Sequence, residues 1–225
     1  MSPSRQRNRF VYPVALACVA ALLLASCSGS GKKATTTSGS AVPSTDAKGR
    51  PAVSLALALG ARQVQAVGVA KPFNLAAARL FQKLMNNYVA TSMTRPLFSG
   101  TRSTGLAGYF APILLPRIGA KGRDRAALCD EGSPVMTTVT STKKQPLNLV
   151  VLENHGTFAM VGARFGITVK GITAQGPLTV TRLGYFVFEE NAAKRWHITG
   201  YDIIVRRDAG TSSTTQTATS TTAAK

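Results

Sequence analysis

The chain has 225 residues and a formal net charge of +18 at pH 7, from 27 basic and 9 acidic residues. Its length leaves room for one domain with a sound hydrophobic core. A charge this basic is common among nucleic-acid-binding proteins, but no helix-turn-helix, zinc-finger or aromatic ribonucleoprotein pattern occurs. Together with the export signal described next, this excludes nucleic acid as a partner.

The first 26 residues are predicted to be a signal peptide. Arg5, Arg7 and Arg9 precede the apolar run Val11–Ala25, as the charged region of an export signal precedes its hydrophobic region. This run has 15 residues and contains Pro13, whereas a helix that crosses the hydrocarbon core needs about 20 apolar residues. The pattern therefore predicts export and cleavage rather than a transmembrane anchor.

The segment Leu24-Ala25-Ser26-Cys27 resembles the lipobox of bacterial lipoproteins. This resemblance implies cleavage between Ser26 and Cys27 and attachment of diacylglycerol to the Cys27 sulfur. Two acyl chains are enough for stable anchoring, since each buried CH₂ contributes about 0.8 kcal/mol. The protein is therefore expected on the outer face of the bacterial cell membrane, held by lipid on Cys27. The alternative is an ordinary secretory peptide with an incidental cysteine.

Composition divides the mature chain into three parts. Residues 27–51 comprise the lipidated cysteine and a Ser-, Thr-, Gly- and Lys-rich tether, which lacks the large apolar side chains that offset the entropy of folding. Residues 52–208 are predicted to form one α+β domain. The Thr- and Ser-rich tail, 209–225, is expected to be disordered and is a candidate for O-glycosylation. With Cys27 lipidated, Cys129 has no partner for an intramolecular disulfide.

Helices are predicted in the first half of the domain. The clearest covers Leu75–Val89, where apolar residues recur at spacings of three and four, with Asn74 as N-cap and Pro96 as the stop. Two shorter helical segments are expected around 104–116 and 123–129, the first broken early by prolines. The helices are thus unequal in length.

Strands are predicted after residue 134, where Val, Ile, Thr and aromatic residues dominate. The five segments are Val135–Thr142, Leu147–Glu153, Phe158–Ile172, Leu178–Glu189 and Trp196–Val205. In the third segment Phe165, Ile167 and Val169 alternate with polar residues, as in a sheet with one solvated side. Helices followed by strands predict an α+β fold, with N-terminal helices packed on a curved antiparallel sheet of four to five strands.

The last predicted hairpin, from Tyr185 through Trp196 to Val205, and the order of helices before strands resemble nuclear transport factor 2-like domains. The resemblance covers residues 73–207. It implies that a long amphipathic helix and shorter ones close the sheet into a cone. Such domains include isomerases and dehydratases with an Asp or His in the cone, and also non-catalytic binding modules, some of them tethered to actinobacterial membranes.

An isomerase of that type needs a carboxylate as general base and a hydroxyl that donates to the developing oxyanion. Asp130, Tyr88 and Tyr109 are the candidate polar groups of such a cavity. Against catalysis, Asp130 and Glu131 stand at a predicted helix end, where acids are usually solvated or pair with nearby arginines, here Arg123 and Arg125. No metal-ligand spacing or phosphate-binding loop occurs, so no catalytic residue, metal or cofactor is predicted.

The basic excess predicts anionic contacts. Three of the 27 basic residues and no acidic ones precede Cys27, so the mature chain keeps a charge of +15. Phospholipid headgroups attract each nearby Lys or Arg by about 1 kcal/mol, which makes anionic headgroups one candidate contact and cell-wall polymers another. Six basic residues fall on or beside predicted strands and are expected on the solvated outer face of the sheet. They are Lys143, Lys144, Lys170, Arg182, Arg206 and Arg207.

Three functions follow from these observations. The favoured one is a lipid-anchored envelope protein whose non-catalytic domain binds a partner protein, a lipid or a small apolar ligand. The alternatives are an isomerase- or dehydratase-like enzyme with a carboxylate in the cone, and a structural or assembly factor of an envelope transport or cell-wall system. An Asp, Glu or His that points into a cavity would favour the enzyme.

Overall fold

The computed structural model describes residues 53–60, 64–65, 75–154 and 157–220. The predicted signal peptide, the tether with Cys27, the predicted cap Asn74 and the last five residues lie outside the described residues. Within the described ranges no helix is long and apolar enough to cross a membrane.

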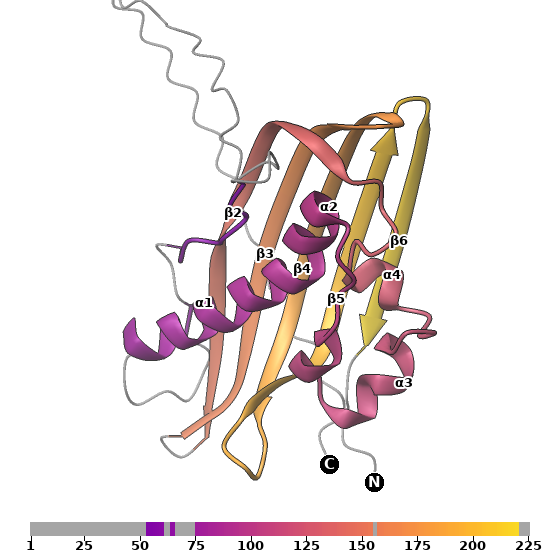
Figure 1. Cartoon of the computed structure of the whole chain (residues 1–225). Coiled ribbons are helices and arrows are strands. Elements are labelled where there is room, and N and C mark those ends of the chain that lie inside the picture. Colours follow the sequence, from indigo (N-terminus) through magenta and orange to yellow (C-terminus); the bar gives the residue numbers. More distant parts are fainter. Residues whose placement is uncertain (1–52, 61–63, 66–74, 155–156, 221–225) are drawn as a thin grey trace, which may run out of the picture. The chain divides into compact units, whose positions relative to one another are not determined.

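A six-stranded sheet carries the fold, and its strands are neighbours in chain order (Figure 1). They are β1 (Val64–Gln65), β2 (Met136–Asn154), β3 (Thr157–Thr173), β4 (Gly176–Glu190), β5 (Trp196–Ala209) and β6 (Ser212–Ser220). The short β1 runs parallel to β2, and all other neighbouring strands are antiparallel. The predicted α+β class and the antiparallel sheet are therefore confirmed.

Strand β2 joins two segments that the sequence predicts as separate strands. The pairing of β2 with β3 shifts register between Gln145 and Asn148, on either side of Pro146. Proline has no N–H to donate and is found on edge strands or at irregularities of the ladder. The second condition holds here, because Pro146 lies at the register shift. On its other side β2 pairs with β1, and Leu147 forms a bridge to Leu59.

Strand β6 corrects the expectation that residues 209–225 are disordered. Ser212–Ser220 pair with β5 over its whole length, from Ala209 opposite Ser212 to Tyr201 opposite Ser220. The segment is polar, but threonine is β-branched and suits a strand. From Gln216 onward every second side chain is shielded from solvent, and Ala218 and Ser220 are buried. Backbone pairing with β5 and this burial therefore order a segment whose composition alone indicates disorder.

The first helical segment extends past Pro96, which is therefore not the stop that the sequence predicts. Helix α1 (Leu75–Val89) continues through a π-helical turn, η1 (Ala90–Thr94), into α2 (Arg95–Ser99). Pro96 lies in the first turn of α2, where a missing N–H is tolerated, directly after the widened turn. Gly100, with a left-handed φ of 63°, ends the helix and donates its N–H to the Pro96 carbonyl at 3.1 Å.

The remaining helical elements are single turns. They are η2 (Leu106–Tyr109), η3 (Pro112–Leu114), α3 (Leu115–Ile118) and α4 (Arg125–Leu128). Pro112 begins η3 and Pro116 lies in the first turn of α3, so the second predicted helix is divided into short pieces. The third predicted helix contracts to α4, and Gly132 follows it with a left-handed φ of 84°.

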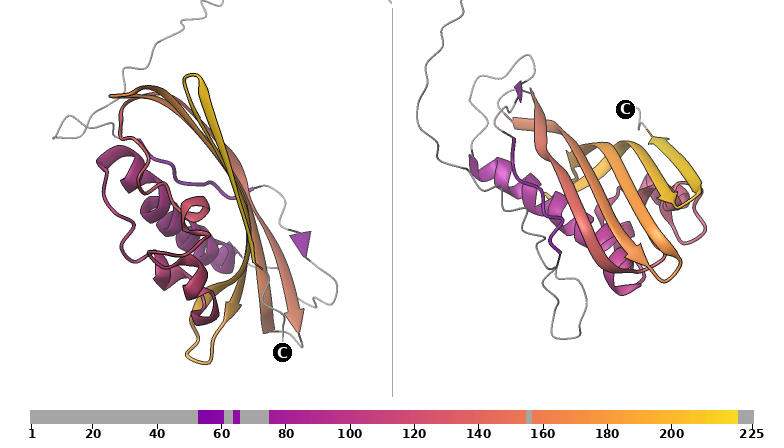
Figure 2. Two further views of the ribbon diagram at one scale, coloured as in Figure 1. Left: turned by 90° about the vertical axis from the view of Figure 1, so that its right-hand side faces the viewer. Right: turned by 90° about the horizontal axis from the view of Figure 1, so that it is seen from above.

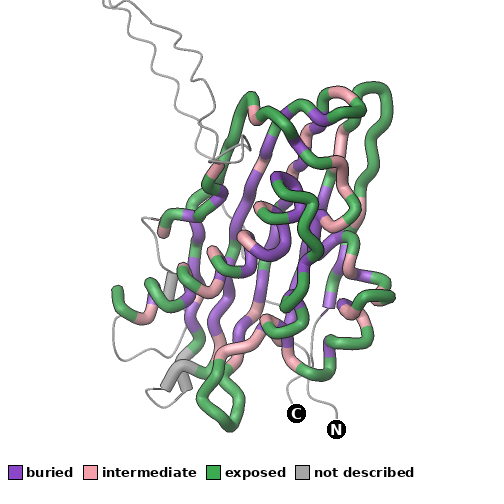
Figure 3. The backbone as a smooth tube through the Cα atoms, in the orientation of Figure 1, coloured by how far each residue is buried: buried purple, intermediate pink, exposed green. Residues whose placement is uncertain are grey.

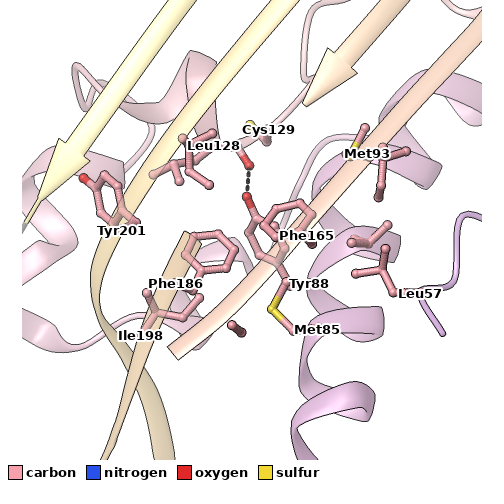
Figure 4. Packing of buried hydrophobic residues seen from close by; sticks show 14 of the residues in the cluster. Leu57, Met85, Tyr88, Met93, Leu128, Cys129, Phe165, Phe186, Ile198 and Tyr201 are labelled. Carbon is pink, nitrogen blue, oxygen red and sulfur yellow. Dashed lines mark hydrogen bonds between the residues drawn. The ribbon is translucent and has the colours of Figure 1, made fainter. Parts of the chain in front are cut away.

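All the helices pack on one face of the sheet (Figure 2). Burial alternates along the strands, as the purple and green segments of Figure 3 show. Phe165, Ile167 and Val169 are buried and Lys170 is exposed, which confirms the predicted alternation. Between the layers lies an aromatic core, in which Tyr88 of α1 meets Phe186 edge-on at 4.8 Å (Figure 4).

Candidate functional site

Arg182 is a charged residue on the helix-facing side of β4. The buried residues of this strand alternate in the same phase as Arg182, and they are Leu178, Val180, Gly184, Phe186 and Phe188. The Arg182 side chain is 0% exposed, so the expectation that it lies on the solvated face is wrong. The same expectation is wrong for Arg207 on β5. It lies two residues after buried Val205, on the same face of the strand, and its side chain is only 15% exposed.

Asp130 holds both of these arginines. Its Oδ2 accepts a hydrogen bond from Arg182 Nη2 at 3.0 Å, and its Oδ1 accepts from Arg207 Nη2 at 2.6 Å and Nε at 3.1 Å. The Asp130 side chain is itself 0% exposed, and its backbone N–H donates to the Ser92 carbonyl of η1 at 2.8 Å. We call Tyr88, Ser92, Asp130, Arg182 and Arg207 the buried arginine cluster.

Tyr88 joins the cluster to the main chain. Its hydroxyl donates to the Leu128 carbonyl at 2.6 Å, the dashed line of Figure 4. Arg182 Nη1 donates to the same carbonyl at 2.8 Å and lies 3.3 Å from the Tyr88 hydroxyl and 3.4 Å from Ser92 Oγ. Burial raises the pKa of Tyr88 to about 12, although the positive charge of Arg182 opposes the shift. The hydroxyl therefore stays protonated and serves as a donor at neutral pH.

The guanidinium of Arg182 stays charged in this dry environment. Burial is the largest single influence on its pKa and would lower it, but Asp130, Tyr88 and Cys129 together outweigh burial and the pKa is raised. Its Nε has no hydrogen-bond partner among the described residues. A buried ion pair is stable only when its charges are matched and hydrogen-bonded. Both terminal nitrogens of Arg182, Nη1 and Nη2, donate hydrogen bonds within the cluster.

The structure brings two of the three predicted cavity residues together. Asp130 and Tyr88 meet through Arg182, whereas Tyr109 is half-buried beside them, with its ring 6.0 Å from that of Tyr88 and its hydroxyl 3.2 Å from Thr91 Oγ1. Asp130 is neither solvated nor paired with Arg123 or Arg125, contrary to expectation. Its neighbour Glu131 pairs with Arg125 instead.

Chemically, the buried arginine cluster is suited to holding structure rather than to proton transfer. Both oxygens of Asp130 are occupied by guanidinium groups, so a base at this position would first have to release an arginine. The hollows described below are lined by other residues than Tyr88, Tyr109 and Asp130. Cys129, which precedes Asp130 in the chain, is a buried cysteine outside any disulfide.

The opposite face of the sheet exposes apolar side chains that sequence reasoning did not single out. Leu183, Tyr185 and Ile204 are 42%, 37% and 44% exposed. Leu183 and Ile204 are directly opposite each other on β4 and β5. We call Met160, Leu183, Tyr185, Val187 and Ile204 the Tyr185 surface.

Two hollows flank Tyr185 on this face. One, of about 360 Å³, is lined by Met160, Val187 and Asp202 among others, and the second, of about 480 Å³, by Arg164, Leu183 and Ile204 among others. Both are in the size range of ligand pockets. The Tyr185 side chain between them lies against Gly162 of β3, where a Cβ would collide with the Tyr185 hydroxyl.

Charged side chains of both signs border the Tyr185 surface. Asp202 is opposite Tyr185 on β5, and Glu189 lines one of the two hollows. Arg164 is opposite Tyr185 on β3, and Lys143 and Lys170 are exposed farther along the same face. No carboxylate of the described residues lies within ion-pair distance of these three. Arg206, in contrast, is paired with Asp208 at 2.9 Å. The border of the surface therefore offers basic and acidic groups to a partner.

Across the described part of the chain, no three His, Cys, Asp or Glu side chains gather in a way that could hold a metal ion. Comparison with protein families, curated proteins and solved structures finds no match to this chain. The geometry of the domain and the motif at Cys27 therefore carry the functional argument.

Proposed function

We propose that this chain is a lipoprotein anchored through diacylglycerol on Cys27 to the outer face of the bacterial cell membrane, and that its α+β domain binds an envelope protein without catalysis. The anchor rests on the lipobox-like segment Leu24-Ala25-Ser26-Cys27. The binding role rests on one observation, the exposed Tyr185 surface with its two flanking hollows.

A protein partner suits this surface better than other occupants. Apolar side chains gathered on one solvent-exposed face mark interaction sites in soluble domains. Tyrosine and arginine dominate the energetic centres of protein interfaces, and here Tyr185 and Arg164 are cross-strand neighbours. Arg164 on one side of Tyr185 and Asp202 on the other suit a partner that places complementary charges around an apolar centre. An assembly role in an envelope system would use the same surface.

We further propose that the domain has the cone-like architecture of nuclear transport factor 2-like proteins. The long helical segment from α1 to α2 across one face of a twisted sheet supports this (Figures 1 and 2). In such a cone the ligand would enter between helices and sheet. Here that space contains Phe165, Phe186 and Tyr88, whose packing supports binding on the outer face instead and gives the isomerase alternative no support.

The binding role is tested with a photo-crosslinking amino acid at Ile204 in the membrane-anchored protein. The captured protein is identified, purified and titrated against wild type and two variants. Leu183→Asp places a charge on the Tyr185 surface, whereas Ile113→Asp places one at a more exposed apolar position, 67% accessible, on η3. We expect Leu183→Asp to weaken binding at least tenfold and Ile113→Asp to leave it unchanged. Equal affinities for all three proteins, or capture of a small ligand alone, would contradict the proposal.

A further inference from the structure

A basic hollow lies on the helical side of the molecule, away from the Tyr185 surface. It has a volume of about 540 Å³, and its charged lining residues are Arg102, Lys121, Arg125 and Glu131. Arg102 belongs to the loop after α2, Lys121 to the turn between α3 and α4, and Arg125 to α4. Three segments of the chain thus direct cations towards one site.

The structure holds one of these cations in place. Arg125 Nε donates to Glu131 Oε2 at 3.0 Å, and Nη1 donates to the Ile118 carbonyl at 3.2 Å. These contacts fix the guanidinium and leave N–H groups of both terminal nitrogens for another acceptor, because a guanidinium has five donors in all. The side chain is therefore arranged before any ligand arrives.

The turn that carries Lys121 is closely packed. Gly122 donates its N–H to the Gly119 carbonyl at 2.8 Å, and a Cβ at this position would collide with the Arg117 carbonyl. Only glycine fits there without a shift of the backbone. The turn therefore sets where the base of Lys121 lies at the rim of the hollow.

The charges around the hollow are unbalanced. The lining contains three cations and one carboxylate, and Glu131 is engaged by Arg125. No carboxylate of the described residues lies within ion-pair distance of Arg102 or Lys121. An anion in the hollow would supply the missing counter-charge.

The number of cations indicates phosphate. One guanidinium is enough to bind a carboxylate in bidentate fashion, whereas a phosphate offers several oxygens to donors from different directions. We propose that the hollow formed by Arg102, Lys121 and Arg125 binds a phosphate-bearing anion, either a phospholipid headgroup or a soluble phosphate ester. This site is separate from the Tyr185 surface, and its existence does not depend on the anchor at Cys27.

The test uses the full protein purified from membranes in a non-ionic detergent. It is titrated by calorimetry with inorganic phosphate, with glycerophosphoglycerol, and with mixed micelles of phosphatidylglycerol or phosphatidylcholine. The double variant Arg102→Ala/Lys121→Ala is compared with Arg79→Ala/Lys83→Ala, which removes the same charge from exposed positions of α1. We expect the first variant to lose at least about tenfold in affinity and the second to match wild type.

A gain of affinity separates a binding site from a structural role. Glu131→Gln removes the only carboxylate of the lining and frees Arg125, so binding should tighten several-fold. Glu190→Gln, the same charge change at the β4–β5 turn, should have no effect.

The proposal is overturned if wild type binds none of the four probes, or if the two double variants weaken binding equally, as net charge alone would predict. Binding of phosphate and glycerophosphoglycerol identifies a soluble phosphate site. Binding of phosphatidylglycerol micelles but not of the soluble probes identifies a lipid headgroup site. Because these probes do not involve the envelope partner, failure here leaves the proposed function intact.

Discussion

Arg182 Nη2 lies 3.0 Å from Asp130 Oδ2, and neither side chain has any exposed surface. The pair joins the loop after α4 to the middle of β4, and Arg207 extends it to β5. A charge pair this deep is weak evidence for stability as such, because desolvation opposes the Coulomb attraction. Neutral replacement of only one of the two residues, however, leaves the other as a buried charge without its counter-charge.

Asp130→Asn is therefore expected to lower the free energy of unfolding by about 3 to 5 kcal/mol. Two guanidinium groups lose their counter-charge, and that of Arg182, 0% exposed, cannot reach solvent without opening the core. Urea unfolding followed by circular dichroism measures the effect. As a control, Glu190→Gln removes a carboxylate whose partner Lys194 is 83% exposed, and it should change stability by less than about 0.5 kcal/mol. A neutral result for Asp130→Asn would mean that the pair is open in solution.

Tyr88 makes the free energy of unfolding depend on pH in the alkaline range. Its pKa rises from 10.0 to about 12 in the folded protein, so folding favours the protonated hydroxyl. The contribution is complete below pH 10 and is lost as pH rises from 10 to about 12, where the unfolded chain ionises first. The free energy of unfolding should thus fall over that interval. The pKa of Tyr201 is also raised, by burial and by its hydrogen bond to Asp124, and adds to the fall.

The Tyr88 contribution is isolated with Tyr88→Phe. At pH 8 this variant should lose about 1 to 2 kcal/mol, because the hydrogen bond to the Leu128 carbonyl is absent. Its unfolding free energy should decline less steeply than that of wild type between pH 10 and 12. Parallel curves for the two proteins would show that Tyr88 does not titrate in this range.

The inward arginines could have been predicted from the sequence. Leu178, Val180, Phe186 and Phe188 set the buried phase of their strand, and Arg182 falls in it. Arg207 likewise continues the phase of Ile203 and Val205. The expectation that basic residues face solvent was given more weight than the alternation of buried and exposed residues along the strands. The alternation is the stronger signal, because a slip of one residue would expose the whole apolar face of the strand.

Strand β6 could not be predicted in the same way, since polar composition alone indicates disorder. Its order is tested with neighbouring substitutions. Ala218 is 2% exposed beneath the helices, whereas Thr217 points to solvent. Ala218→Asp should destabilise the protein by more than about 2 kcal/mol, because it buries an unpaired charge, and Thr217→Asp by less than about 0.5 kcal/mol. In a disordered tail both substitutions would be neutral in thermal unfolding.

Gly162 determines the shape of the Tyr185 surface. A Cβ at this position would collide with the hydroxyl end of Tyr185. This flexible side chain can rotate outward at a small cost in free energy. Gly162→Ala should therefore leave the unfolding free energy within about 1 kcal/mol of wild type and weaken binding of the envelope partner. Gly108→Ala is the matched control, because a Cβ there meets no atom within 4 Å. If both variants bind the partner as wild type does, the hollows beside Tyr185 do not belong to the interface.

The two surface sites show where sequence reasoning stops. The period of β4 places Leu183 and Tyr185 outward, but only the pairing with β5 brings Ile204 beside them. In the basic hollow, Arg102 and Lys121 are 19 positions apart and meet only because proline-divided turns fold back between them. Fold class and the positions of β2 to β5 follow from local patterns, whereas β6 and these sites depend on tertiary arrangement.

The measurement that tests the central claim most directly is the intact mass of protein purified from membranes, compared with Cys27→Ala and followed by detergent partitioning of both. The account predicts that wild type has lost residues 1–26, has gained diacylglycerol and enters the detergent phase, whereas the variant carries no lipid and does not. Wild type with an unmodified Cys27 that stays in the aqueous phase would contradict a lipid-anchored envelope protein.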